Sequence, residues 1–486
     1  MSPILSGRIA ECNSSYMANN LPQWFPSCLA WNYSNAQLTR TKLQDSSVTS
    51  PSSAVPSSAS DSIRASLTPG PVNPSTEPIA VIPERLPWRH TFISLRVHNY
   101  RLFAASNFIA VIAVWMQRIS QDWIVLQLSG SVAAVGVTVA MQFTPVLLLG
   151  PWGGLMADRF SKRRLLQICQ ATAGLCAATL AALALTHSLE VWHVYAIAVV
   201  LGLVTVLDQP SRQVFVNELV GPQYLRNAIS MNSTIFQLGG LIGPAVAGGL
   251  LSAVGGGYAF VFNAVACTIT VVMLSMLRVD ELHTAPPTPK AKGMLREAVR
   301  YAWAKPTIRW PWVLAGAVAV FALSLPVLLA GYADHVFGVG ASGYGLLNTL
   351  VALGSLTGAV ASARRRLLRL RTVVFGAGLY GALLALASFM PSLPVFGALM
   401  TVSGFCALTF LTSANQLVQT SANMAIRGRV MSLYTMVLMG GQALGGPMLG
   451  GLAQLWGTRW ALLLGGAVPA VVAGLLGLWL RGKREE

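Results

Sequence analysis

The sequence predicts an all-α membrane protein with twelve transmembrane helices in two six-helix bundles, and three observations support that prediction. Only 10% of the 486 residues are charged and 54% are hydrophobic, whereas a soluble domain carries about 25% charged residues. From Tyr100 onward, apolar runs recur at the length of about 20 residues that a helix needs to cross a bilayer. Basic residues gather in alternate segments between those runs. We therefore expect most of the chain to lie in a lipid bilayer.

Residues 1–86 differ in composition from everything after them. The stretch from Ser46 to Thr76 is mostly Ser, Pro, Ala and Thr and has no periodic apolar face. Such a segment cannot bury enough surface to offset the entropy lost on ordering, so we predict a disordered extension. It is either an upstream segment without a role in function or a docking element built around Trp24, Phe25 and Trp31.

The apolar runs after this extension define two sets of spans. An N-terminal bundle within 87–277 is expected to contain helices near Leu102–Leu128, Ala133–Ala157, Leu165–Leu185, Val191–Leu207, Ile229–Val254 and Tyr258–Leu277. A linker, 278–311, separates it from a C-terminal bundle within 312–486. The second set of helices is expected near Trp312–Ala330, Tyr344–Ala361, Val373–Phe389, Leu393–Thr412, Val430–Leu455 and Trp460–Leu480.

The charges between the spans predict orientation. One side holds Arg159, Lys162, Arg163, Arg164, Arg212, Arg226, the basic residues from Arg278 to Arg309, Arg364, Arg365, Arg366, Arg369, Arg371, Arg427, Arg429 and the tail Arg481, Lys483 and Arg484. The other side holds Arg459 with Glu190, Asp334 and histidines. Because basic loops stay on the cytoplasmic side, we expect a plasma-membrane protein with both termini in the cytoplasm. The formal charge of +17 thus reflects orientation, and we expect no nucleic-acid partner.

The linker and the repeats support a division into two halves. Within the linker, Met294–Trp303 spaces its apolar residues as one face of a helix, which either lies along the inner membrane surface or is a solvated connector. The fifth span contains Gly243-Pro244, and the eleventh contains Gly446-Pro447 roughly 200 residues later. Parallel six-helix repeats are typical of secondary transporters.

The loop after the second span is the most specific motif. It contains Gly154, Asp158, Arg159, Lys162 and Arg163 and resembles the G-x-L-A-D-R-x-G-R-K loop of the major facilitator superfamily, with Met156 and Ser161 as departures. The resemblance implies a gating loop, in which the carboxylate of Asp158 meets the positive N-terminus of a neighbouring helix and stabilises one state of the transport cycle. A loop that serves only for membrane orientation is the alternative.

Three further segments narrow the resemblance. Trp115–Ser131, Asp208–Leu219 and Asn227–Asn232 look like the corresponding parts of the superfamily's exporter branch that includes the enterobactin exporters. The Arg-bearing fourth-helix motif of the proton-coupled drug exporters is absent. Their antiporter motif, G-x-x-x-G-P-x-x-G-G, is matched in part by Gly239, Gly243, Pro244 and Gly248, with Ala247 in place of a Gly. The resemblance implies rocker-type alternating access and outward transport.

Small residues one helical turn apart let helices approach closely, and a proline bends a span. The Gly-Pro elements, Gly239, Gly243, Pro244 and Gly248 with Gly446 and Pro447, are therefore either hinges of a moving helix or sites of static close packing.

Charges inside the spans are few, so each is a candidate for function. Arg118 and Asp122 in the first span are four residues apart and share a helix face. A coupling proton needs a carboxylate whose proton affinity changes between burial and pairing with a cation, which Asp122 and Arg118 can provide. A permanent neutralising pair near the outer interface is the alternative reading.

Two other polar sets stand out. Asp208 and Glu218 flank Arg212, and we expect a salt-bridge cluster at the cytoplasmic ends of the fourth and fifth helices in preference to a substrate contact. The neutral polar side chains within spans are candidates for a substrate cavity or for bridges between helices: Asn107, Gln117, Gln142, Asn232, Gln237, Asn348 and Gln442.

The sequence contains no phosphate-binding Gly-x-x-x-x-Gly-Lys-[Ser/Thr] loop, so an ion gradient or the substrate's own gradient must supply energy. We predict a monomeric secondary transporter without cofactor or metal, which exports a small hydrophobic or amphipathic compound, a drug or a siderophore-like metabolite, in exchange for protons. An uptake symporter of the same fold is the main alternative. A membrane enzyme is disfavoured because the Asp208, Arg212 and Glu218 cluster lacks a nucleophile.

Overall fold

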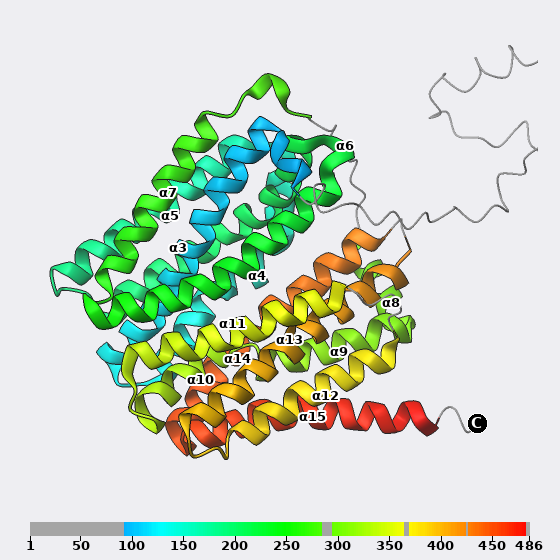
Figure 1. The fold of residues 1–486 in the computed structure, drawn as a ribbon. Coiled ribbons are helices and arrows are strands. Elements are labelled where there is room, and N and C mark those ends of the chain that lie inside the picture. Colours follow the sequence, from blue (N-terminus) through cyan, green and yellow to red (C-terminus); the bar gives the residue numbers. More distant parts are fainter. Residues whose placement is uncertain (1–91, 284–293, 364–368, 424–425, 483–486) are drawn as a thin grey trace, which may run out of the picture. The chain divides into compact units, whose positions relative to one another are not determined.

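The computed structural model describes residues 92–283, 294–363, 369–423 and 426–482 (Figure 1). Its regular elements in these ranges are all helical, which confirms the predicted fold class. The extension 1–86, residues 284–293 of the linker and the basic residues Arg364, Arg365, Arg366, Lys483 and Arg484 lie outside the described residues.

The N-terminal bundle follows a short turn, η2 (Ile93–Arg96). Its helices are α3 (His98–Ser129), α4 (Val132–Arg159), α5 (Lys162–Leu185), α6 (Val191–Ala253) and α7 (Gly257–Ser275). The short η3 (Val279–Glu281) and α8 (Met294–Ala304) belong to the linker. The C-terminal bundle contains α9 (Pro306–Phe321), α10 (Leu325–Gly331), η4 (Tyr332–Val336), α11 (Gly340–Ala363), α12 (Leu370–Ala387), α13 (Leu393–Ser421), α14 (Arg427–Trp456) and α15 (Thr458–Gly482).

Every predicted span coincides with a helical segment. In the part of the chain that is described, eleven segments are long and apolar enough to cross a membrane. The remaining predicted span, Val430–Leu455, lies in α14, whose 30 residues are long enough to cross a membrane. Its many glycines and its Arg and Gln residues lower its hydropathy. The seventh span combines α9, α10 and η4 over Pro306–Val336, so it begins before the expected Trp312.

One predicted boundary is wrong. We expected a loop between Leu207 and Ile229, but α6 continues through it, and its one residue with non-helical backbone angles is Gly221 (φ 66°, ψ 178°). Glycine adopts this positive φ without steric cost. The break divides α6 into two spans, Val191–Gly221 and Gln223–Ala253. The polar residues of this segment suggested a loop, yet Ser211 and Glu218 are buried helical residues that face the bundle.

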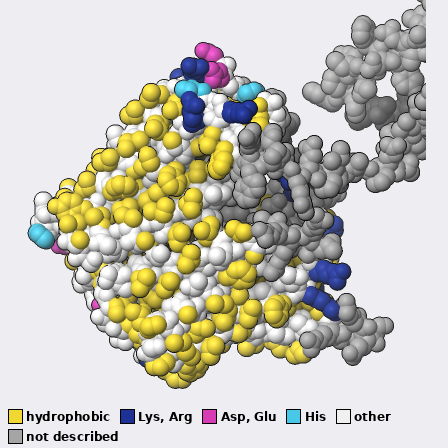
Figure 2. All heavy atoms as spheres, viewed as in Figure 1, with side chains coloured by type: hydrophobic (Ala, Val, Ile, Leu, Met, Phe, Trp, Pro, Cys, Tyr) yellow, Lys and Arg dark blue, Asp and Glu magenta, His cyan; other side chains and the backbone are white. Residues whose placement is uncertain are grey.

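The helices alternate in direction, so the turns that carry the basic residues gather at one end of the spans. We call it the basic end; the turns at Gly130, His187, Gly255, Gly338 and Gly457 mark the opposite end. In Figure 2, hydrophobic side chains cover much of the visible face, whereas Lys and Arg gather along its upper and right margins. This distribution fits helices whose flanks face lipid.

The two bundles meet at the opposite end. The principal contacts join α4 to α14 and α6 to α11. A Cβ placed on Gly136 near the start of α4 would overlap the carbonyl oxygen of Gly446, and one on Gly248 would lie 2.9 Å from the Cα of Gly345. Only glycine permits backbones to approach this closely. Nearer the basic end of α4, Leu148 and Trp152 are exposed.

The linker attaches to a different bundle on each side. Its first part is bound to α6, since the backbone N–H of His283 donates a 2.8 Å hydrogen bond to the carbonyl oxygen of Glu218. Its helix α8 packs on α9 and α14, with Ala298 and Ala302 fully buried. The hydroxyl of Tyr301 accepts a 3.0 Å hydrogen bond from the backbone N–H of Asn423.

Candidate functional site

Asp122 lies where the bundles meet. It is only 2% exposed, near the end of α3, and its Oδ2 accepts a 3.3 Å hydrogen bond from the hydroxyl of Tyr344 on α11. The ring of Tyr344 stacks on Trp123 with 5.8 Å between ring centroids. Asn348 on the next turn of α11 donates to the carbonyl oxygen of Tyr344. A carboxylate of the N-terminal bundle is thus in contact with the C-terminal bundle.

Arg118 and Asp122 do not form an ion pair within 4 Å, as a permanent neutralising pair would. Among the described residues, the Arg118 side chain takes part in no ion pair or hydrogen bond. The guanidinium carbon lies 5.2 Å from the ring centroid of Phe143 and 5.9 Å from that of Trp115. Its Nε is buried without a hydrogen-bond partner in this part of the chain. Cation–π contacts of this kind stabilise a cation without neutralising its charge.

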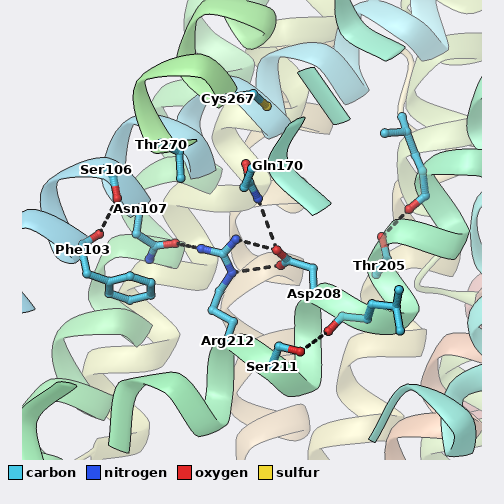
Figure 3. A network of polar contacts seen from close by, with 12 residues as sticks. Phe103, Ser106, Asn107, Gln170, Thr205, Asp208, Ser211, Arg212, Cys267 and Thr270 are labelled. Atoms are coloured by element: carbon cyan, nitrogen blue, oxygen red, sulfur yellow. Dashed lines mark hydrogen bonds and ion pairs between the residues drawn. The ribbon is translucent and has the colours of Figure 1, made fainter. Parts of the chain in front are cut away.

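A second charged network lies inside the N-terminal bundle (Figure 3). Arg212 forms a two-point contact with Asp208 one helical turn earlier, through Nε to Oδ2 at 2.9 Å and Nη2 to Oδ1 at 2.8 Å. Arg212 Nη1 donates to Asn107 Oδ1 on α3 at 2.8 Å, and Gln170 on α5 donates to Asp208 at 3.3 Å. Two-point Arg–carboxylate pairs are among the strongest charged contacts in proteins. This network ties three helices together.

Glu218 is not part of the Arg212 network. It is 5% exposed and forms an ion pair with Lys162 at the start of α5, with 3.2 Å between Lys162 Nζ and Glu218 Oε1. The expected single cluster of Asp208, Arg212 and Glu218 is therefore two separate contacts, because Glu218 lies ten residues beyond Asp208 on the same helix.

The proposed gating loop is described only in part. The helix α4 passes through Gly154 and Asp158 and ends at the exposed Arg159, but the side chain of Asp158 lies outside what the structure describes. Arg163 donates from Nε to the carbonyl oxygen of Leu274 at 2.7 Å and from Nη2 to that of Ser275. A cation at these last carbonyls of α7 is favoured by the helix dipole. The role of Asp158 remains a prediction.

The neutral polar candidates fall into three groups. Asn107 and Gln117 are buried and bonded, the latter accepting from Asn263 on α7. Asn348 and Gln442 bond to backbone carbonyls of their own helices. Gln142, Asn232 and Gln237 are partly exposed, and the buried Oδ1 of Asn232 has no partner among the described residues. This last group contains the remaining candidates for substrate contact.

The glycines of the Gly-Pro elements serve two kinds of contact. Gly239 and Gly243 pack against α3 within the N-terminal bundle, where a Cβ on Gly243 would lie 2.5 Å from that of Trp115. Gly248 and Gly446 instead pack between the bundles, against α11 and α4. The contact of Gly248 involves the neighbour of Tyr344 in the chain, Gly345, and Pro244 contributes its carbonyl oxygen to the same crossing.

Three partners were not anticipated from the sequence: Tyr344, Asn263 and Gln170. Tyr344 differs from the others in that it lies 222 residues from its partner Asp122. A tyrosine in a span gives no local signal, since aromatic residues are ordinary components of an apolar core. The described residues hold no group of three or more His, Cys, Asp or Glu arranged to bind a metal.

Two bundles of membrane-spanning helices that meet at one end are an architecture found among secondary transporters. A bacterial homologue of the human lysosomal transporter Spinster, in an inward-facing conformation, has the same fold, with a TM-score of 0.61 at 17% identity over 79% of this chain and 97% of that one. The model of the transmembrane secretion effector family matches residues 89–485. The chain belongs to this family of the major facilitator superfamily, and it is a transporter rather than an enzyme.

Curated relatives are similar at low identity over most of their length. The multidrug efflux pump Tap of Mycolicibacterium fortuitum is 25% identical over 374 residues, which cover 75% of this chain and 91% of Tap. The enterobactin exporter EntS of Shigella flexneri is 26% identical over 379 residues, 76% of this chain and 88% of EntS.

Proposed function

We propose that the protein exports small hydrophobic or amphipathic compounds, drugs or siderophore-like metabolites, across the plasma membrane in exchange for protons. Export is supported by the relatives, a multidrug efflux pump and an enterobactin exporter. The basic end of the bundles faces the cytoplasm, in keeping with the positive-inside rule. The Gly136–Gly446 and Gly248–Gly345 contacts hold the bundles together at the opposite end, which in this proposal is the outer end.

The buried Asp122 at the contact between the bundles carries this proposal. Alternating access requires the bundles to separate at the opposite end, and that separation replaces the surroundings of Asp122, 2% exposed here, with water. The proton affinity of a carboxyl group depends on burial, on nearby charge and on hydrogen bonds, all of which change in this step. A carboxylate in that position can therefore take up a proton in one conformation and release it in the other.

Transport in proteoliposomes tests the function. The purified full chain, reconstituted with an imposed pH gradient, is given the dye Hoechst 33342, whose fluorescence reports its movement out of the membrane. We expect dye movement that requires the gradient and stops on addition of a protonophore. Dye movement in the same direction as the protons would indicate an uptake symporter instead. Dye movement that does not depend on the pH gradient would contradict proton coupling.

A further inference from the structure

The contact between Asp122 and Tyr344 joins the two bundles at the end that is closed. Asp122 lies on α3 and Tyr344 on α11, and the 3.3 Å hydrogen bond between them connects residues 222 positions apart. Both side chains are buried, at 2% and 0% exposure. The hydrogen bond cannot survive a separation of the bundles at this end.

The position of Tyr344 is determined by its neighbours. Its ring stacks on Trp123 at an interplanar angle of 25°. The next residue, Gly345, forms the close contact with Gly248 of α6, where an added Cβ on Gly345 would lie 2.5 Å from the Cα of Gly248. Because backbone and ring are both fixed, the hydroxyl of Tyr344 leaves Asp122 only when α11 moves relative to α3 and α6.

The strength of this contact depends on the proton state of Asp122. A hydrogen bond from a hydroxyl to a charged carboxylate is roughly twice as strong as one between neutral groups. Arg118 from α3 and Tyr344 from α11 are the charged and titratable groups that act on Asp122 among the described residues of the packed helices. Arg118 makes no hydrogen bond to it, so Tyr344 is the one donor that this part of the chain supplies to the carboxylate.

We propose that Tyr344 is a positioning residue for proton coupling: its hydroxyl holds the opposite end closed while Asp122 is charged and releases it more readily once Asp122 is protonated. This inference rests on the proposed function, since it assigns the coupling to Asp122. Loss of the proton restores the charged carboxylate and with it the stronger hydrogen bond that closes this end.

A cysteine at the contact between the bundles tests the proposal independently of transport. Val132, at the start of α4, is 1% exposed and lies against Gly450 of α14. In the Val132→Cys chain, a membrane-impermeant maleimide added from the outer side reports opening of the opposite end. Because maleimide reacts with the thiolate, the rate at each pH is divided by that of a Ser188→Cys chain, whose cysteine is exposed in the turn after α5 at the same end. The labelling rate is followed between pH 5.5 and pH 8.5 at about 25 °C.

We expect the normalised labelling rate of the Val132→Cys parent chain to be higher at low pH. Tyr344→Phe and Asp122→Asn should both remove this pH dependence and raise labelling at high pH by about three- to tenfold, the loss expected for one charge-assisted hydrogen bond. Tyr380→Phe is the matched control, because the Tyr380 hydroxyl is also buried but bonds to the carbonyl oxygen of Ala322 within the C-terminal bundle. Its pH profile should remain that of the parent.

Two results would overturn the assignment of Tyr344. One is an unchanged pH profile in Tyr344→Phe; the other is an equal loss of pH dependence in Tyr380→Phe, which would indicate general loosening. Failure of the proposed function would give a different pair of results. Labelling would still depend on pH and on Tyr344, but Hoechst 33342 transport would not depend on the proton gradient. Size-exclusion profiles of all variants show whether each remains folded.

Discussion

The two bundles share an architecture but differ in where they place charge. The N-terminal bundle buries Asp122 and Glu218 and holds the Asp208–Arg212 pair between its helices. In the described part of the C-terminal bundle, the ion pairs of the Lys, Arg, Asp and Glu side chains are peripheral: Arg429 with Glu297 of α8 and Asp334 with the exposed His335. Buried polar groups there are mainly hydroxyls, such as Ser403 and Ser413.

This difference separates two tasks. Buried charges are expensive in a membrane and are retained where they do work. The N-terminal bundle therefore holds the candidate coupling groups, while the C-terminal bundle provides a mainly apolar surface that packs against it and contributes Tyr344. Substitutions of matched residues in the two bundles can test whether the difference is functional.

The largest effect is expected for Asp122→Asn. The amide keeps the shape of the side chain but cannot exchange a proton, so proton-driven dye export should fall to the level of empty liposomes. Asp334→Asn, at the opposite end of the C-terminal half and 45% exposed, should retain export within about twofold. Unchanged export in Asp122→Asn would remove the coupling role from the N-terminal bundle.

Loss of Arg212 should be the next largest effect. Arg212→Gln leaves Asp208 charged and only 17% exposed, and an uncompensated carboxylate of this kind costs about 2–3 kcal/mol. Arg429→Gln breaks the 3.7 Å ion pair with Glu297, whose side chain is 60% exposed. An exposed pair of this kind contributes less than about 1 kcal/mol to stability. Thermal unfolding of the purified proteins in detergent compares the two. The double variant Asp208→Asn with Arg212→Gln should regain part of the lost stability. Without such recovery, the loss in Arg212→Gln would not come from the uncompensated charge of Asp208.

The smallest effect concerns the boundary between the bundles. Gly248→Ala places a methyl group 2.9 Å from Gly345, so the crossing of α6 and α11 must widen at a cost of about 1–3 kcal/mol. Gly249→Ala is an ideal control, because nothing lies within 4 Å of its added Cβ. We expect faster maleimide labelling at Val132→Cys in the first variant alone. Equal labelling in both would indicate that the contact is not a seal.

The sequence predicted the fold because its signals are local. Apolar runs located the spans, and a carboxylate inside an apolar run marked Asp122 without any knowledge of its neighbours. Tyr344 could not be found in this way, since its significance comes from a partner on another helix. The same holds for Gly248 and Gly446: the pattern indicated close packing but could not specify that the contact lies between the bundles.

The errors also have physical causes. The segment from Asp208 to Glu218 resembled a loop because it is polar, but its charges are satisfied inside the bundle by Asn107, Gln170 and Lys162. Arg118 and Asp122 share a helix face, so the sequence left a permanent ion pair open as one of two interpretations. In the structure, tertiary contacts decide otherwise: Tyr344 approaches Asp122, and the rings of Trp115 and Phe143 attract Arg118.

The attachment of the linker to both bundles sets a mechanical limit on the transporter. One side is bound to α6 at Glu218 through His283, and the other is bound to the C-terminal bundle through α8. Only residues 284–293 connect the two attachments, and ten residues reach at most about 35 Å when fully extended. While both attachments hold, the points at which the linker leaves α6 and enters α8 can move apart by no more than this distance.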